Sequence, residues 1–188
     1  PKYEAGLVSG SKSDIEHYIG EMYFVRASIY YNFLRTFGDY PIITEVLPDD
    51  KAVMMEKAVR QPRNKVARFI LEDLDKAIAM MKDWGFAGNN RLNKKVALLF
   101  KSRVALYEAS FEKYHKGTGR VPGDTNWPGK RIHANFNLDV DSEVEFFLQQ
   151  AMSAAEQVAD MVTLTTNTGV MDPSTIPTTS GWNPYFEL

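Results

Sequence analysis

Hydrophobic residues recur every three to four positions in four separate stretches of the chain, and this period predicts four amphipathic helices. The expected helices span about residues 14–37, 62–82, 94–114 and 142–161. Extra aromatic residues widen the apolar stripe of the first helix, so we expect neighbours on more than one of its sides. This helix should end at Gly38, because Pro41 cannot continue it.

Residues that favour helix ends support the other boundaries. Pro62 suits a first helical position, and Asn93 is a suitable N-cap. Ser142 and Glu145 fit the capping-box pattern S-x-x-E at the start of the last helix. The four helices therefore have plausible starts as well as apolar faces.

Three irregular stretches separate or follow the helices. Residues 38–61, 116–141 and 163–181 are rich in Gly, Pro, Asn, Ser or Thr, and residues 162–165 are a candidate short strand. Connections of this length are uncommon in compact bundles unless they have a function. The pattern predicts an all-α fold, for which TPR-like helical hairpins and a general helical bundle are both open.

Composition excludes several classes of function. The 188 residues hold 22 Lys and Arg against 24 Asp and Glu, and a net charge of −2 argues against a dedicated nucleic-acid-binding protein. The absence of cysteine excludes disulfides, thiolate nucleophiles and Cys-based metal sites. No apolar run reaches the roughly 18 residues of a membrane span. Because the chain starts at Pro1 and stops on apolar residues, we expect a piece of a longer protein, in which missing targeting signals say nothing about location.

Two patterns suggest metal sites, and each has a simpler interpretation. Glu112 and His115 form an E-x-x-H pair, as in di-iron bundles, but these need a second such pair, so a solvated helix end is favoured. Residues 137–143 place oxygen ligands at alternate positions, as a calcium loop does. The expected glycine is missing, however, and Asp141 and Glu143 suit the start of a helix. We therefore expect no metal or other cofactor, and find no catalytic motif.

Aromatic residues in the irregular stretches are the candidate ligand-binding residues. Trp127, Trp182 and Tyr185 lie beside Pro, Gly or Asn. An aromatic ring held by proline can stack on the C–H face of a sugar, while neighbouring polar groups bind its hydroxyls. The alternative is that each ring packs into a small core under its own loop. Arg35, Arg60 and Arg120 are interpreted as ordinary surface cations.

Three motifs, in order, resemble the SusD/RagB-like family. Residues 21–34 followed by 37–44 resemble E-x-x-F-x-R-A-x-x-Y-[YF]-x-L and the family's [FY]-G-D-x-P. Residues 69–77 resemble I-x-x-D-L-D-x-A, and residues 91–107 resemble R-x-T-K-x-A-A-x-x-L-x-A-R-V-x-L-Y, with Asn93 in place of Thr. The tail, residues 182–188, resembles a later strand motif more loosely.

The motif residues have structural rather than ligand-binding roles. Gly38 and Pro41 shape the exit from the first helix. Arg26 lies in an apolar stripe, so we expect it to pair with a carboxylate or with carbonyls, and Glu21 and Asp39 are the candidate carboxylates.

The resemblance implies a fold, a location and a function. Family members are TPR-containing lipoproteins on the outer-membrane surface of Bacteroidetes, which bind glycans or other nutrients and cap a SusC-like TonB-dependent transporter. They are not enzymes. Residues 1–188 would then be the central, TPR-like part of such a protein, packed as an α-α superhelix, with a lipidated cysteine outside this chain. Residues 116–141 and 163–188 would be the ligand-facing segments. The alternative is a TPR-like platform for protein partners, whose ligand contacts lie elsewhere in the protein.

Overall fold

The computed structural model describes residues 2, 5–83, 90–161 and 163. Its elements are α1 (Lys12–Phe37), α2 (Lys51–Lys57), α3 (Arg63–Met80), α4 (Lys94–His115), the 3-10 helix η2 (Pro128–Arg131) and α5 (Val140–Ala159). The chain divides into two units, Pro1–Val158 and Ala159–Leu188, and the description below concerns the first. Among the described residues every regular element is helical, which confirms the all-α fold class.

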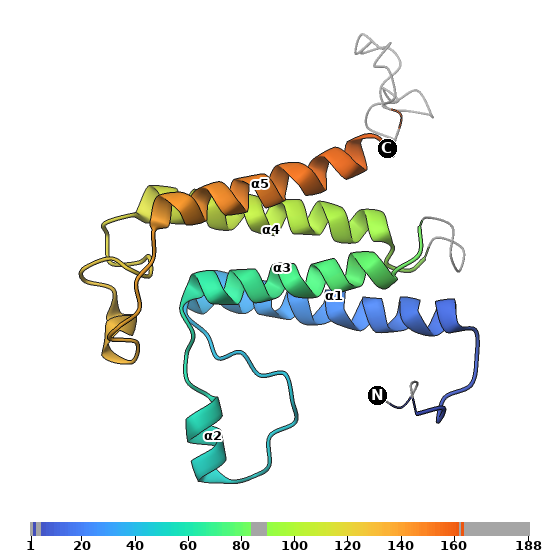
Figure 1. The fold of residues 1–188 in the computed structure, drawn as a ribbon, viewed down its shortest axis with the longest axis horizontal. Coiled ribbons are helices and arrows are strands. Elements are labelled where there is room, and N and C mark those ends of the chain that lie inside the picture. The colour runs from blue at the N-terminus through green and yellow to red at the C-terminus, as the bar shows by residue number, and fades with distance from the viewer. Residues whose placement is uncertain (1, 3–4, 84–89, 162, 164–188) are drawn as a thin grey trace, which may run out of the picture. The chain divides into compact units, whose positions relative to one another are not determined.

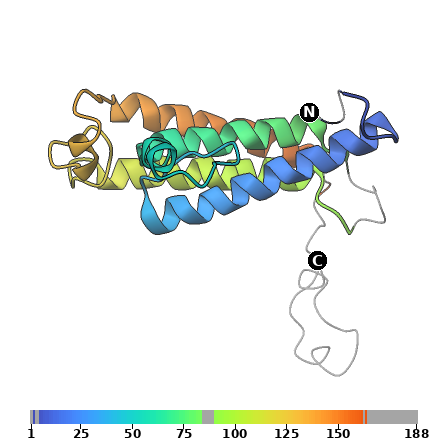
Figure 2. The same ribbon diagram turned by 90° about the horizontal axis from the view of Figure 1, so that it is seen from below.

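The four long helices pack as antiparallel neighbours. α1 lies along α3, and α4 also packs on α3 (Figures 1 and 2). α5 packs against α4 through Ala154 and Val158, which contact Leu98. All four contribute to one apolar core, whose fully buried members include Leu34 of α1, Ile70 and Leu74 of α3, Val104 of α4 and Phe147 of α5. The apolar stripes predicted from the sequence therefore meet in one interior.

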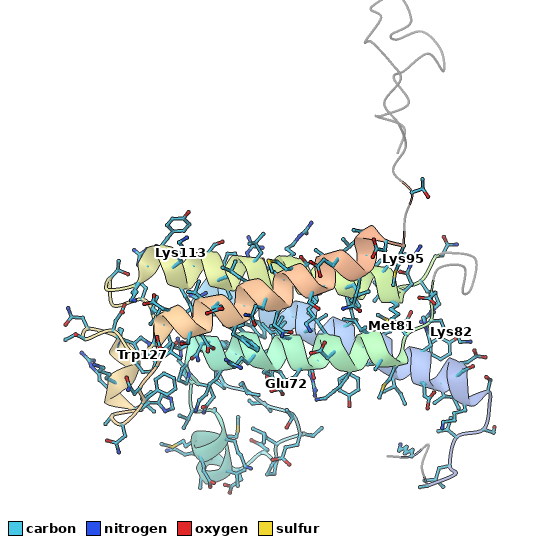
Figure 3. The ribbon with its side chains drawn as sticks, turned by 45° about the horizontal axis from the view of Figure 1, so that its top comes forward. Glu72, Met81, Lys82, Lys95, Lys113 and Trp127 are labelled. Carbon is cyan, nitrogen blue, oxygen red and sulfur yellow. The ribbon has the colours of Figure 1, made fainter. Side chains whose placement is uncertain are left out.

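The connections gather at the two ends of this bundle. Residues 38–62, which include α2, and residues 116–139 leave the same end (Figure 1). The connection from α3 to α4 lies at the opposite end, where Figure 3 shows Met81 and Lys82 far from Trp127. The two longest described connections can therefore meet, although they are distant in sequence.

Two local predictions were incomplete or wrong. The stretch 38–61 contains the short helix α2, whose N-cap Asp50 accepts a hydrogen bond from the Val53 N–H at 2.9 Å. α5 begins at Val140, so Ser142 is not its N-cap. Asp139 takes that place: its carboxylate accepts the Ser142 N–H and hydroxyl at 3.4 and 2.8 Å. The candidate strand at 162–165 falls almost entirely outside the described residues.

The SusD-like motif residues connect one helix with another. Arg26 of α1 donates two hydrogen bonds to Asp73 of α3, at 2.6 and 2.8 Å, and the Asp73 side chain is fully buried. The partner predicted for Arg26 was therefore wrong. Glu21 instead pairs with Arg91, just before α4, with an Nε–Oε1 distance of 2.9 Å. Each motif thus supplies one member of a charged pair whose other member lies in a different motif.

Candidate binding pocket

A pocket of about 660 Å³ lies at the end of the bundle where the long connections meet. Its wall comes mainly from three parts of the chain: the last turn and exit of α1 (residues 35–39), the start of α3 with the residues before it, and the connection from α4 to α5. Phe111 of α4 completes it. Tyr40 and Gln61 form an isolated antiparallel bridge beside it, with N···O distances of 3.2 and 3.1 Å. This bridge holds the entry to and exit from the α2 segment together.

The carboxylate of Asp39 joins all three parts of the wall. Its Oδ1 accepts the Arg63 N–H at 2.8 Å, in the first turn of α3, and its Oδ2 accepts the indole N–H of Trp127 at 2.9 Å. Burial raises the pKa of Asp39, although both hydrogen bonds act in the opposite direction. The aspartate of the G-D-x-P motif therefore caps a helix and anchors a distant connection.

Trp127 is a buried part of the pocket wall. Trp127 is only 3% exposed, and its ring stacks on the imidazole of His133 with a 9° interplanar angle. Figure 3 places it in the connection between α4 and α5. Packing under the loop, the alternative interpretation of this residue, accounts for these contacts. That Trp127 also contacts a ligand stays a prediction. Trp182 and Tyr185 lie outside the described residues.

One wall of the pocket is a buried ion pair. Arg63 donates to both oxygens of Glu108 at 2.7 Å, and its guanidinium lies 3.3 Å from the ring centroid of Phe111. Burial by itself lowers the pKa of Arg63, but the hydrogen bonds and the negative charge of Glu108 together outweigh it and raise this pKa above its ordinary value. This arginine is fully used by the fold and offers little to a ligand.

Three further arginines and one aromatic residue line the pocket, and sequence reasoning did not join them. Arg35, Arg60 and Arg120 were interpreted as separate surface cations, and Phe37 as part of the α1 stripe. The only signal in the sequence is that each arginine lies within three residues of a Gly or Pro, where the chain leaves a helix or turns. Such a signal cannot show that the three positions share one pocket.

Neither pattern proposed as a metal site is supported by its surroundings. Glu112 is fully buried in the bundle, while His115 packs against Phe111 with centroids 4.4 Å apart. Asp139 is used by its own helix, and Asp141 pairs with Lys116 at 2.6 Å. Within the described part of the chain, no group of three or more His, Asp or Glu side chains could hold a metal ion. No described helix is long and apolar enough to cross a membrane.

Comparison with known proteins finds similarity to SusD-like proteins. No family model matches the chain. SusD-like protein P2 of Formosa agariphila is 29% identical over 109 residues, which are 58% of this chain and 21% of that protein. A crystal structure of a SusD-like protein from Bacteroides fragilis, also 29% identical, covers 61% of this chain and 22% of its own, with a TM-score of 0.49. The chain thus spans about a fifth of the length of the curated relative that it matches.

The described helices thus form an all-α bundle of antiparallel pairs with a polar and aromatic pocket at one end. Over the matched residues, the chain is similar to a SusD-like protein, as the resemblance of its three motifs predicts.

Proposed function

We propose that the chain is part of a nutrient-binding protein on the outer face of the bacterial outer membrane, which captures a glycan and delivers it to a SusC-like TonB-dependent transporter. The protein would be held there by a lipid anchor outside this chain, and would bind and release its ligand rather than catalyse a reaction. The proposal extends this similarity to the whole protein's activity. The pocket beside Asp39 is the observation within this chain that supports it most directly.

The pocket combines the two kinds of group that saccharide sites use. Phe37 at its edge is 50% exposed and stacks on Tyr40, with centroids 5.6 Å apart and an angle of 23°. Tyr40 stacks in turn on Phe33, at 4.4 Å and 22°, so the exposed ring is backed by a second and a third. A rigid aromatic face of this kind packs against sugar C–H groups, while arginine N–H groups around it can donate to hydroxyls.

A direct titration tests the proposal. The full-length protein is titrated with a panel of soluble polysaccharides, and binding is followed by heat and by tryptophan fluorescence. We expect saturable binding of one class of polysaccharide, weakened about tenfold by Phe37→Ala, because a stacked ring contributes on the order of 0.5–1.5 kcal/mol beyond the burial of its area. Phe37→Ala is preferred to Trp127→Ala because Trp127 is buried. Leu106→Ala, which removes a similarly exposed apolar side chain of α4 outside the pocket, should leave binding unchanged.

A second candidate function, a platform for protein partners, is favoured by a different surface. Met22, Val25 and Ile29 follow one another along α1 and are 61%, 40% and 47% exposed. Apolar stripes that stay exposed on a helix are typical of surfaces that another protein segment covers. If Met22→Glu with Ile29→Glu abolishes assembly with the transporter and leaves glycan binding intact, the stripe serves the platform function.

If a folded Phe37→Ala protein binds the same glycans as wild type, glycan capture by this pocket is contradicted.

A further inference from the structure

The pocket concentrates positive charge in a chain that is slightly acidic overall. Four arginines and a single acidic residue, Asp39, contribute to its wall, whereas the whole chain has a net charge of −2. One of these, Arg63, is neutralised by Glu108. Among the described residues, none of the other three forms an ion pair with a carboxylate: Arg35 lies 5.6 Å from the ring of Tyr31, and Arg60 approaches only the Asp39 carbonyl, at 3.5 Å. The third, Arg120, is exposed.

The backbone that carries Arg60 is held in place from both sides. The imidazole Nε2–H of His133 donates to the Arg60 carbonyl oxygen at 2.7 Å, so the connection from α4 to α5 is bonded to the residue itself. The next residue, Gln61, forms the bridge to Tyr40. The position of this arginine is therefore fixed before any ligand arrives.

The backbone around Arg120 is held by one buried carboxylate. Asp124 accepts hydrogen bonds from the N–H groups of Gly117 and Gly119, both at 2.9 Å, and from that of Val121 at 3.4 Å. Gly119 and Val121, on either side of the arginine, are buried, while Arg120 is exposed. A tight turn with buried flanks thus projects one cation from a rigid base. Preorganisation of this kind lowers the entropic cost of binding.

These arginines surround a flat aromatic face rather than a small cradle. Arg35 and Phe37 come from the last turn of α1, and Arg60 and Arg120 complete the wall from two other segments. A pocket of about 660 Å³ is within the range of organic-ligand sites and is much larger than a single oxyanion requires. Guanidinium groups recognise carboxylate and sulfate oxygens through charge-assisted hydrogen bonds. The combination suits an anion that also has a ring to stack.

We propose that this pocket selects a negatively charged saccharide, one that carries carboxylate or sulfate groups. The inference rests on the proposed function and narrows its ligand class. Arg60 and Arg120 bind the anionic groups from anchored backbone, Arg35 adds a third charge from α1, and Phe37 packs against a sugar ring. Ligand specificity thus follows from charge in addition to stacking.

The test compares polysaccharides that differ only in charge. The full-length protein is titrated by calorimetry with polygalacturonate and its methyl ester, and with κ-carrageenan and its desulfated product. We expect at least one anionic polymer to bind at least tenfold more tightly than its neutral counterpart, and binding to weaken between 50 and 300 mM NaCl, because salt screens exposed charges. Arg60→Ala and Arg120→Ala should each weaken binding about tenfold, since a charge-assisted hydrogen bond is lost. Arg103→Ala, an exposed arginine of α4 outside the pocket, is the matched control.

The possible failures are distinguishable. The inference is overturned if charged and neutral polymers bind with equal affinity. It is also overturned if a folded Arg60→Ala, Arg120→Ala double variant binds anionic polymers as tightly as wild type. Neither result contradicts glycan capture itself. Binding of inorganic sulfate with no binding of any polysaccharide also overturns it, since the site would then take a free oxyanion. If the folded protein binds no polysaccharide of any charge, the proposed function fails together with the inference. Circular dichroism melting curves establish that each variant is folded.

Discussion

Individual charged side chains are buried among α3, α4 and α5. Arg63 pairs with Glu108, and Arg68 of α3 donates to both oxygens of Glu143 in α5, at 2.7 and 2.6 Å. Glu112 of α4 is close enough to both carboxylates to feel their charge, is fully buried, and among the described residues neither of its oxygens has a hydrogen-bond partner. Burial, reinforced by the two neighbouring carboxylates, raises the pKa of Glu112 to about 9. This side chain is therefore protonated at neutral pH.

The protonated state of Glu112 makes stability depend on pH. The unfolded carboxyl loses its proton near pH 4.5, whereas the folded one keeps it until pH about 9. Between these values the unfolded state binds fewer protons, so the free energy of unfolding falls as pH rises, by up to about 1.4 kcal/mol per pH unit. Glu112→Gln should flatten this slope and be more stable than wild type at pH 8.5. Urea unfolding at pH 5, 7 and 8.5 measures this, with the exposed Glu156→Gln as control. Parallel pH profiles of wild type and Glu112→Gln would contradict the assignment.

At the scale of helices, charged residues of the three motifs form ion pairs that connect one element with another, rather than contacts with a ligand. The pair of Arg26 and Asp73 joins α1 to α3, and that of Glu21 and Arg91 joins α1 to the segment before α4. Helix positions could be predicted from sequence because apolar periodicity is local. For the ion pairs, only the type of partner could be predicted, because an arginine in an apolar stripe requires a carboxylate. That this carboxylate is Asp73 depends on how two helices align.

Breaking the ion pair between α1 and α3 should be costly. Among the described residues, Arg26→Ala leaves the buried Asp73 carboxylate paired only with Lys76, at 3.6 Å, so we expect a loss of about 3 kcal/mol in the free energy of unfolding. Adding Asp73→Ala should restore part of this loss, because no uncompensated charge remains buried. The exposed pair of Lys116 and Asp141 is the control, and Lys116→Ala should cost less than about 1 kcal/mol. Urea denaturation of wild type, both single variants, the double variant and Lys116→Ala measures these losses, and additive losses of Arg26→Ala and Asp73→Ala would show that the two residues are not coupled.

Two variants at the start of α5 distinguish the S-x-x-E capping box, which the sequence predicts, from the cap formed by Asp139 in the structure. If Asp139 is the cap, Asp139→Ala should reduce the free energy of unfolding by about 1 kcal/mol, through loss of its bonds to Ser142 and Asp141. Glu145→Ala should change little, because within the described part of the chain the Glu145 carboxylate accepts a hydrogen bond only from the Gln149 side chain. The S-x-x-E pattern would require the opposite order, with Glu145→Ala the more damaging. Thermal unfolding of the two variants distinguishes them.

At the scale of the described unit, Pro1–Val158, the pocket is built from segments that local patterns cannot bring together. Asp39 and Trp127 are 88 residues apart, and neither position carries a signal for the other. The sequence identified Trp127 as a candidate and the 116–141 stretch as irregular, but exposure could not be inferred from either. Arg35, Arg60 and Arg120 became a group only once the helix ends were placed side by side.

The bond between Asp39 and Trp127 should hold this end of the bundle together. Trp127→Phe keeps most of the buried ring and removes the indole N–H, which leaves the partly buried Asp39 carboxylate with one donor fewer. We expect a loss of about 1–2 kcal/mol in the free energy of unfolding. Hydrogen exchange of the backbone amides in residues 117–133 should also quicken, more than in α3. Unchanged exchange and unchanged stability would show that the indole bond contributes nothing.

The clamp formed by Asp124 has a consequence for how such a protein can evolve. The carboxylate fixes three backbone N–H groups around Arg120, a contact that ignores the identity of the side chain between them. Because the main chain is held and the exposed side chain is not, substitutions at position 120 can replace one recognition group by another without refolding the turn. Trp127 and Val121 are buried and hold the same connection in place. Its backbone is therefore fixed, while the exposed side chain at position 120 can be replaced. A substitution at this position can thus change the chemistry of the pocket wall while the backbone of the turn stays the same.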